Sequence, residues 1–170
     1  ITACIENCKR ACAPYGALTA LDVGPLGELL EPSGTLAFED AVAEYARIVK
    51  AGEDAGAELL FVEPSTDLYE LKAALRAAKE NTHLPILASM SFEAGGRTFT
   101  GCTVESFAAT ARGLGADAVG INCSLGPKEI FPVAKRLAGA VPGNFPVFVT
   151  PNAGLRGADG RGYDIRRQLC

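Results

Sequence analysis

The sequence predicts an α/β fold built around a parallel sheet, and three observations support this. Five short apolar runs alternate with longer, alanine-rich amphipathic stretches. Each run is rich in Val, Ile, Leu or Phe and is bounded by Gly, Pro or polar residues, as is typical of strands buried on both faces. Two phrases, AGAELLFVE and LGADAVGIN, share a helix end, a Gly-Ala turn and a strand. Such repeated βα phrases favour right-handed crossovers between parallel strands. Periodicity alone does not separate a barrel from an open sheet.

The apolar runs give the expected strands. Each is short, and no linker or low-complexity segment interrupts the series, so about five βα units are predicted. The strands are expected at Ala17–Asp22, Glu58–Glu63, Leu84–Met90, Asp117–Asn122 and Phe145–Thr150.

Helices are expected between the strands and at the start of the chain. Val42, Tyr45 and Val49 recur at helical spacing, and Gly56 is a stop signal for that helix. Asp67 is the expected N-cap of the next helix, and the phrase Thr-Val-Glu-Ser resembles a capped helix start. The five helices are expected at Ile1–Ala13, Phe38–Ala55, Asp67–Lys79, Thr103–Leu114 and Lys128–Ala140.

Length and composition favour one soluble domain in a reducing compartment. The 170 residues fit a single domain, and a hydrophobic fraction of 48% excludes disorder. With 16 basic and 20 acidic side chains, the net charge of −4 argues against a nucleic-acid partner. No apolar run reaches the ~18 residues of a membrane span. The six cysteines favour reduced thiols in a cytoplasmic protein over a secreted disulfide scaffold.

Polar residues at the carboxyl ends of the predicted strands form the candidate site, because parallel α/β folds bind ligands there. Seven side chains form this ring: Asp22, Glu63, Ser89, Ser91, Asn122, Cys123 and Asn152. Every lysine lies on a predicted helix, so a Schiff-base lysine at a strand end is not expected. The single histidine, His83, precedes a strand and is expected at the opposite end of the sheet, where no Ser-His-Asp triad can form.

The two acids of this ring have two interpretations each. Glu63 closes the hydrophobic run LLFVE, where an unpaired carboxylate would be costly. It is either a clamp for a cationic group such as an ammonium, which we favour, or a structural acid bonded to loop amides. Asp22 has the same two interpretations at even odds.

The cysteines alone give a weak signal, since buried cysteines usually fill space. Cys123 stands at a strand end before a Gly-containing loop. Cys4, Cys8 and Cys12 fall on one face of the first helix, which a buried helix face explains more simply than a metal site. Space-filling or exposure is the simpler explanation of Cys102, and the terminal Cys170 has no interpretable context.

Several long phrases together carry a more specific resemblance. Between about residues 17 and 163 the chain contains, in order, LDVGPLGELLEPSGTLAFEDA, EPSTDLYELKAALRAAKE, LPILASMSFEAGGRTFTG, GADAVGINCSLGP and TPNAGL. These phrases resemble the homocysteine-binding module of cobalamin-dependent methionine synthase, and resemble it more closely than they do the stand-alone homocysteine S-methyltransferases. The resemblance identifies residues 1–170 as a partial homocysteine S-methyltransferase barrel domain.

The resemblance implies a (β/α)8 TIM barrel whose active-site Zn²⁺ is held by three cysteine thiolates. Cys123 matches the first of these, Glu63 matches the acid that holds the homocysteine amino group, and Asn152 matches an amide beside the metal. Asp22 and Ser89 are expected to line the same substrate site. The family's Gly-Gly-Cys-Cys-Gly phrase and its opening strand are missing, so a fragment of about five βα units is expected, incomplete at both ends.

The implied activity is zinc-dependent transfer of a methyl group to the homocysteine thiol, which forms methionine. Coordination to Zn²⁺ deprotonates a thiol, and the resulting thiolate can attack an activated methyl group. The family carries its methyl donor, methylcobalamin, on a separate corrinoid domain, which would be a partner. Two alternatives stay open: an inactive barrel remnant that binds an amino acid or a partner, and a barrel hydrolase that uses Asp22 and Glu63 as acid and base.

Overall fold

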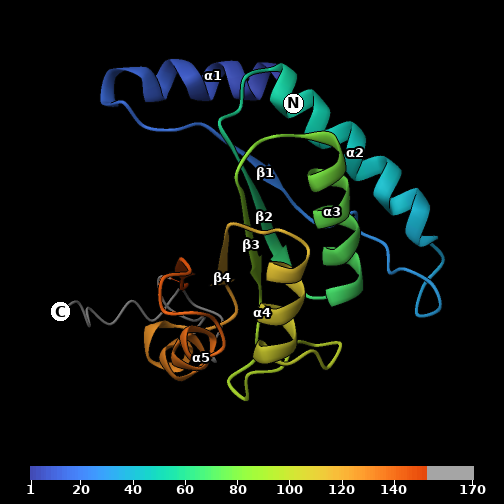
Figure 1. Ribbon diagram of the computed structural model, residues 1–170, viewed down its shortest axis with the longest axis vertical. Helices are drawn as coiled ribbons and strands as arrows, with labels where there is room; N and C mark the ends of the chain where they lie inside the picture. Colours follow the sequence, from blue (N-terminus) through green and yellow to red (C-terminus); the bar gives the residue numbers. More distant parts are fainter. Residues whose placement is uncertain (153–170) are drawn as a thin grey trace, which may run out of the picture.

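Five parallel strands form a single sheet in which strand order follows chain order. The computed structural model describes residues 1–152. The strands are β1 (Ala20–Val23), β2 (Leu59–Ser65), β3 (Ile86–Met90), β4 (Ala118–Asn122) and β5 (Val147–Thr150). All neighbouring pairs are parallel, and the order is β1-β2-β3-β4-β5. Figure 1 labels the first four of these strands.

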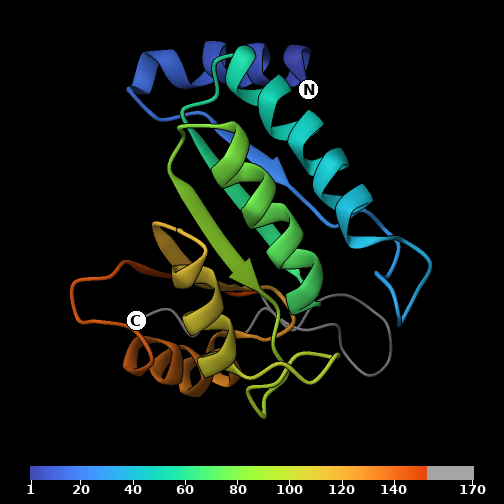
Figure 2. The ribbon, with the colours of Figure 1, turned by 45° about the vertical axis from the view of Figure 1, so that its right-hand side comes forward.

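Helices connect successive strands and pack against one another in the same sequence. They are α1 (Thr2–Cys12), the 3-10 helix η1 (Ala13–Tyr15), α2 (Phe38–Asp54), α3 (Leu68–Asn81), α4 (Val104–Gly113) and α5 (Pro127–Gly139). Contacts join α2 to α3, α3 to α4, and α4 to α5, and Figure 2 shows α2 and α3 lying along one face of the sheet.

The strand order settles the choice between an open sheet and a barrel. A doubly wound sheet reverses its strand order at a switch point and carries helices on both faces. Here five consecutive βα units follow one another without reversal, as they do around a (β/α)8 barrel. The predicted α/β class and the partial barrel of about five units are therefore confirmed.

The five predicted strands are present, with small shifts at their ends. β1 begins at Ala20 instead of Ala17, because η1 and Gly16, with φ +60°, turn the chain first. β2 runs past Glu63 to Ser65, and its pairing with β3 shifts register between Val62 and Ser65. Pro64 lies in this irregular step, where its missing N–H costs the sheet no hydrogen bond.

Two predicted helix starts, those of α3 and α4, are confirmed by side-chain caps. The Asp67 carboxylate accepts hydrogen bonds from the backbone N–H groups of Tyr69 (2.6 Å) and Glu70 (3.2 Å). The Thr103 hydroxyl accepts one from the N–H of Ser106 (3.2 Å). Each cap satisfies donors that the first helical turn leaves without partners, which fixes where the helix begins.

The two faces of the sheet have different roles. Because side chains alternate along a strand, Leu60 and Val62 of β2 point to the helices and are buried there. Phe61 and Glu63 point to the concave inner face. Across that face the Phe61 ring lies 5.2 Å from the Phe148 ring of β5. The outer face is therefore the hydrophobic core, and the inner face is where the candidate site residues gather.

A glycine allows the aromatic contact on the inner face. Gly120 of β4 lies beneath the Phe148 ring, and a Cβ placed there would come within 2.3 Å of that ring. Phe148 can therefore lean across β4 toward β2 only because residue 120 has no side chain.

The two repeated phrases of the sequence end in equivalent contacts. Glu58, just before β2, accepts a hydrogen bond from the Thr19 N–H just before β1 (2.8 Å). Asp117, just before β4, accepts one from the Ile86 N–H at the start of β3 (2.8 Å). We call these two contacts the carboxylate clips. Each ties the amino-terminal ends of two neighbouring strands and so helps to set their register.

Within residues 1–152, no helix has both the length and the apolar character that crossing a membrane requires.

Candidate functional site

Three side chains at the carboxyl ends of β2 and β4 are joined by hydrogen bonds. The Asn122 side-chain amide donates to the Glu63 carboxylate. The Cys123 thiol donates to the Asn122 side-chain oxygen, with 2.9 Å between Sγ and Oδ1. The structure thus brings together Glu63 and Cys123, two of the predicted site residues, through a residue between them.

The backbone after β4 turns sharply to place the thiol. Cys123 and Ser124 both have φ +61°, a left-handed conformation that is uncommon for residues other than glycine. The Cys123 N–H donates to the Thr150 carbonyl of β5 (3.1 Å), and the Leu125 N–H donates to the Cys123 carbonyl (2.7 Å). These bonds hold the strained turn, which is a feature often found at functional sites.

The surroundings of the site disfavour negative charge on three of its side chains, Asp22, Glu63 and Cys123. Burial raises the pKa of Glu63 above its usual value, and the nearby Asp22 carboxylate raises it further. Desolvation likewise raises the pKa of Asp22. Burial raises the pKa of Cys123, and the Glu63 charge adds to that effect. A bound cation near these groups would relieve all three effects.

Asp22 and Ser89 lie on the same inner face at different depths. Asp22 is the exposed residue near the end of β1, next to Phe61 in the register. Ser89 is fully buried in β3, and its hydroxyl donates to the Val62 carbonyl (3.4 Å). Asp22 is thus open to a ligand, whereas Ser89 lies in the floor beneath the polar ring.

Asn152 lies on the loop that follows β5, beside the Cys123 turn. Its backbone N–H donates to the Leu125 carbonyl (3.0 Å), which ties the loops after β4 and β5 together. The rest of the Gly- and Arg-rich stretch, residues 153–170 with Cys170, lies outside the described residues.

Two further predictions about side-chain placement hold. The lysines Lys9, Lys50, Lys72, Lys79, Lys128 and Lys135 all lie on helices. The backbone N–H of His83 donates to the Glu53 carboxylate of α2 (3.0 Å), before β3 begins. His83 is therefore at the opposite end of the sheet from Cys123.

The helix face that carries the cysteines of α1 was expected to be buried, and this expectation is wrong. Cys4 is exposed, while Cys8 and Cys12 are partly exposed with their sulfur atoms 3.8 Å apart. Ile5 is the one residue of α1 that is buried, so α1 packs on the rest of the described chain mainly through that side chain. Residues 1–152 contain no group of three or more His, Cys, Asp or Glu side chains arranged to hold a metal ion. Cys123 therefore supplies one sulfur donor, not a complete site.

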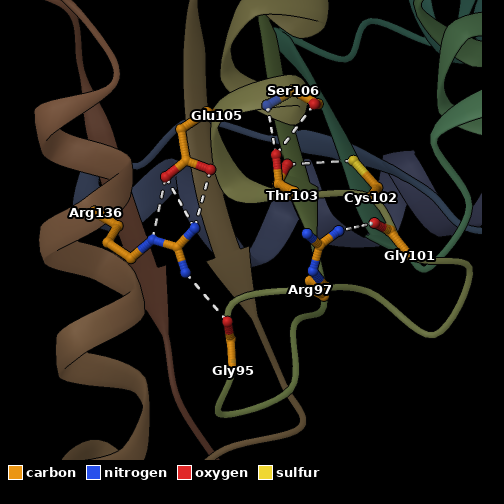
Figure 3. A network of polar contacts seen from close by, with 8 residues as sticks. All are labelled: Gly95, Arg97, Gly101, Cys102, Thr103, Glu105, Ser106 and Arg136. Carbon is orange, nitrogen blue, oxygen red and sulfur yellow. Dashed lines mark hydrogen bonds and ion pairs between the residues drawn. The ribbon is translucent and has the colours of Figure 1, made fainter.

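Loops around the strand ends are held by their own contacts. The buried Glu70 carboxylate accepts hydrogen bonds from the Leu26 N–H (2.8 Å) and the Tyr45 hydroxyl (3.0 Å), which fastens the loop after β1. The loop after β3 is held by Arg136 of α5, which donates a hydrogen bond to the Gly95 carbonyl of that loop. Arg136 also forms an ion pair with Glu105 of α4 (2.9 Å; Figure 3). These contacts fix the loops that surround the site.

Sequence reasoning placed Asn122 in the ring of strand-end residues but gave it no role. Its partners, Glu63 and Cys123, come from a strand 59 residues away and from its own neighbour. The one available signal was that Glu63 and Asn122 both end a strand in the two repeated phrases.

Comparisons with known proteins agree with this picture. The family model described as homocysteine S-methyltransferase matches residues 1–169. The chain is 33% identical to methionine synthase of Mycobacterium tuberculosis over 119 residues, which are 66% of the chain and 10% of that enzyme. It is 32% identical to methionine synthase of Mycobacterium leprae over 120 residues, again 66% of the chain and 10% of the enzyme. The chain thus spans about a tenth of these relatives.

Solved structures support the fold. The apo form of the homocysteine methyltransferase MmuM from Escherichia coli matches with a TM-score of 0.77 and 23% identity, over 90% of this chain and 59% of that one. Its metallated form matches with a TM-score of 0.71 and 22% identity, over 86% and 54%. On the strength of the family match along nearly its whole length, the chain belongs to the homocysteine S-methyltransferase family.

Proposed function

We propose that this chain is the homocysteine-binding part of an enzyme that transfers a methyl group to the homocysteine thiol and forms methionine. The observation that carries the proposal is that the Asn122 side chain hydrogen-bonds to both Glu63 and Cys123. This arrangement supports the proposal because a carboxylate could hold an ammonium while a nearby sulfur holds a soft metal. Family membership and the methionine synthase relatives support the same reaction.

In this proposal the acids hold the amino group of the substrate. Glu63 accepts hydrogen bonds from the ammonium, and Asp22 adds a second negative charge at the same end of the site. Binding the cation would favour the ionised form of both acids, which burial disfavours. Asn152 would border the site on the side of Cys123, and the buried Ser89 would form part of the floor of the site.

Cys123 is proposed as one thiolate ligand of a Zn²⁺ ion. Its soft sulfur and its position at a strand end fit such a site, and the similar structure of MmuM has been solved in a metallated form. The other ligands would have to come from outside residues 1–152, since the described residues hold no group of three donors. When bound, the metal would lower the pKa of the substrate thiol. Within this chain, Cys123 would hold the ion and Glu63 would orient the amino acid.

The proposal also includes the methyl donor and the cellular compartment of the enzyme. The methyl donor in this proposal is methylcobalamin on a separate corrinoid domain, as the sequence resemblance to cobalamin-dependent methionine synthase implies. The partial exposure of Cys123, Cys8 and Cys12 as free thiols is compatible with a cytoplasmic enzyme.

The test measures L-homocysteine binding by calorimetry for the parent chain and for Glu63→Gln. Loss of the charged hydrogen bond should weaken binding roughly 10- to 100-fold. Glu93→Gln is the control, because within the described chain the Glu93 side chain makes no hydrogen bond, and it should bind like the parent. Equal affinities of the parent and Glu63→Gln would contradict the amino-group clamp.

Zinc content separates the enzyme from the inactive remnant. Zinc is measured with and without homocysteine, in this chain and in the same chain lengthened with its own downstream coding sequence. One zinc per lengthened chain, lost in Cys123→Ala, supports the enzyme. Homocysteine binding with no zinc in either chain would support the remnant.

A further inference from the structure

Within residues 1–152, Asn122 is the one side chain that hydrogen-bonds to both Glu63 and Cys123. One end of its amide meets Glu63 and the other meets Cys123. Asn122 itself is 7% exposed, so water does not compete freely for these contacts. A buried amide with both ends engaged is geometrically well defined.

The chemistry of the partners fixes which way the amide faces. An ionised carboxylate can only accept hydrogen bonds, so the Asn122 NH₂ group must face Glu63. The amide oxygen then faces Cys123, where a thiol can donate to it. With the amide reversed, two oxygen atoms would face each other at Glu63.

The backbone of Asn122 is held as firmly as its side chain. Asn122 ends β4 and pairs with Thr150 of β5. Its carbonyl accepts a hydrogen bond from the hydroxyl of Ser91, the residue that follows β3, so the chain supports it from the other side as well (2.7 Å). Asn122 therefore sits on a rigid strand end between two strands and not on a loop.

We propose that Asn122 is a positioning residue that sets the spacing between the amino-acid clamp at Glu63 and the sulfur at Cys123. The inference rests on the proposed function, in which a single substrate must reach both groups. If Asn122 is lost, each group can adopt other rotamers, and the two no longer keep a fixed separation.

The experiment uses Cys123 itself as the reporter and needs no ligand. The full chain is treated with iodoacetamide, and the alkylation rate of each cysteine is followed by mass spectrometry. Asn122→Ala removes the acceptor that holds the thiol, and should speed Cys123 alkylation about fivefold. Asn122→Asp has the same size, keeps an acceptor oxygen and adds a negative charge that disfavours the thiolate, so its Cys123 should react more slowly than the parent's. Cys102 is the internal reference for loosening of the fold.

A second pair of variants tests the Glu63 side and covers the case in which Asn122→Ala does not fold. Glu63→Gln removes the charge but keeps an acceptor for the Asn122 amide, whereas Glu63→Ala removes both. If Asn122 transmits the contact, Cys123 should react about threefold faster in Glu63→Ala than in Glu63→Gln.

Three results would overturn the inference: an unchanged Cys123 rate in Asn122→Ala, an equal rise in Asn122→Asp, or equal rates in the two Glu63 variants. None of these depends on homocysteine. Failure of homocysteine binding with the expected alkylation rates would therefore count against the proposed function and leave the role of Asn122 intact.

Discussion

At the scale of single residues, the acids Asp22 and Glu63 govern how the site responds to pH. They lie on the inner face of adjacent strands, and the negative charge of one raises the pKa of the other. An ammonium ligand needs ionised carboxylates. The affinity for such a ligand should therefore follow the ionisation of Glu63, whose pKa lies above the usual value of a glutamate.

We expect homocysteine binding to weaken as pH falls through the raised pKa of Glu63. Asp22→Asn removes the like charge, so the pKa of Glu63 should fall and the acid limb of the binding curve should move to lower pH. Calorimetric titrations at a series of pH values would measure both curves. An unshifted limb in Asp22→Asn would mean that desolvation alone sets the pKa of Glu63.

The raised pKa of Glu63 also has a consequence for folding. The folded chain binds a proton at Glu63 more readily than the unfolded chain does, so this residue makes stability fall as pH rises from the ordinary glutamate pKa through the raised value. Glu63→Gln should remove that dependence. Urea unfolding of the two proteins across that pH interval measures it, and identical pH profiles would contradict the assignment.

At the scale of strands and helices, local signals were readable in the sequence and distant contacts were not. Asp67 and Thr103 were predictable as caps because each acts on backbone groups within the next three residues. The register shift at Pro64 and the contact of Glu63 with Asn122 depend on how strands align. No local pattern fixes that alignment.

The carboxylate clips should contribute measurably to stability. Asp117→Ala leaves the Ile86 N–H without its partner, and should lower the free energy of unfolding by about 1–2 kcal/mol. Asp54→Ala is the control, because the Asp54 carboxylate makes no hydrogen bond in the described chain, and it should change stability by less than ~0.5 kcal/mol. Urea denaturation measures both. Equal changes in the free energy of unfolding in the two variants would show that the hydrogen bond from Ile86 to Asp117 does not stabilise the fold.

Gly120 and Phe148 should behave as a coupled pair. Gly120→Ala forces its Cβ against the Phe148 ring, and should cost about 1–3 kcal/mol of unfolding free energy. In a Phe148→Ala background the ring is gone, so the same change should cost much less. A double-mutant cycle by urea denaturation gives the coupling. Additive effects would contradict the close approach.

At the scale of the whole molecule, the strand order carries the information that the sequence pattern lacked. Apolar runs at Leu84–Met90 and Asp117–Asn122 predicted strands, but an open sheet would have produced the same runs. The barrel was expected only from the family resemblance. The order β1-β2-β3-β4-β5 then distinguished the two architectures.

The sheet should be unevenly protected from its centre to its edges. In the part of the chain that the structure describes, β1 and β5 each pair with one neighbour, and Val149 of β5 is 37% exposed. Amide hydrogen exchange should be slowest in β3 and fastest in β5. Equal protection at low protein concentration would mean that the edges are covered.

The two carboxylate clips occupy equivalent positions in the two repeated phrases of the sequence. Glu58 and Asp117 hold equivalent places in the two phrases, as do the turn glycines Gly56 and Gly115, both near φ +87°. Glu63 and Asn122 stand at the same separation, 59 residues. The phrases that lead into β2 and into β4 therefore repeat one local design, and the hydrogen bond between Glu63 and Asn122 joins equivalent positions of the two copies.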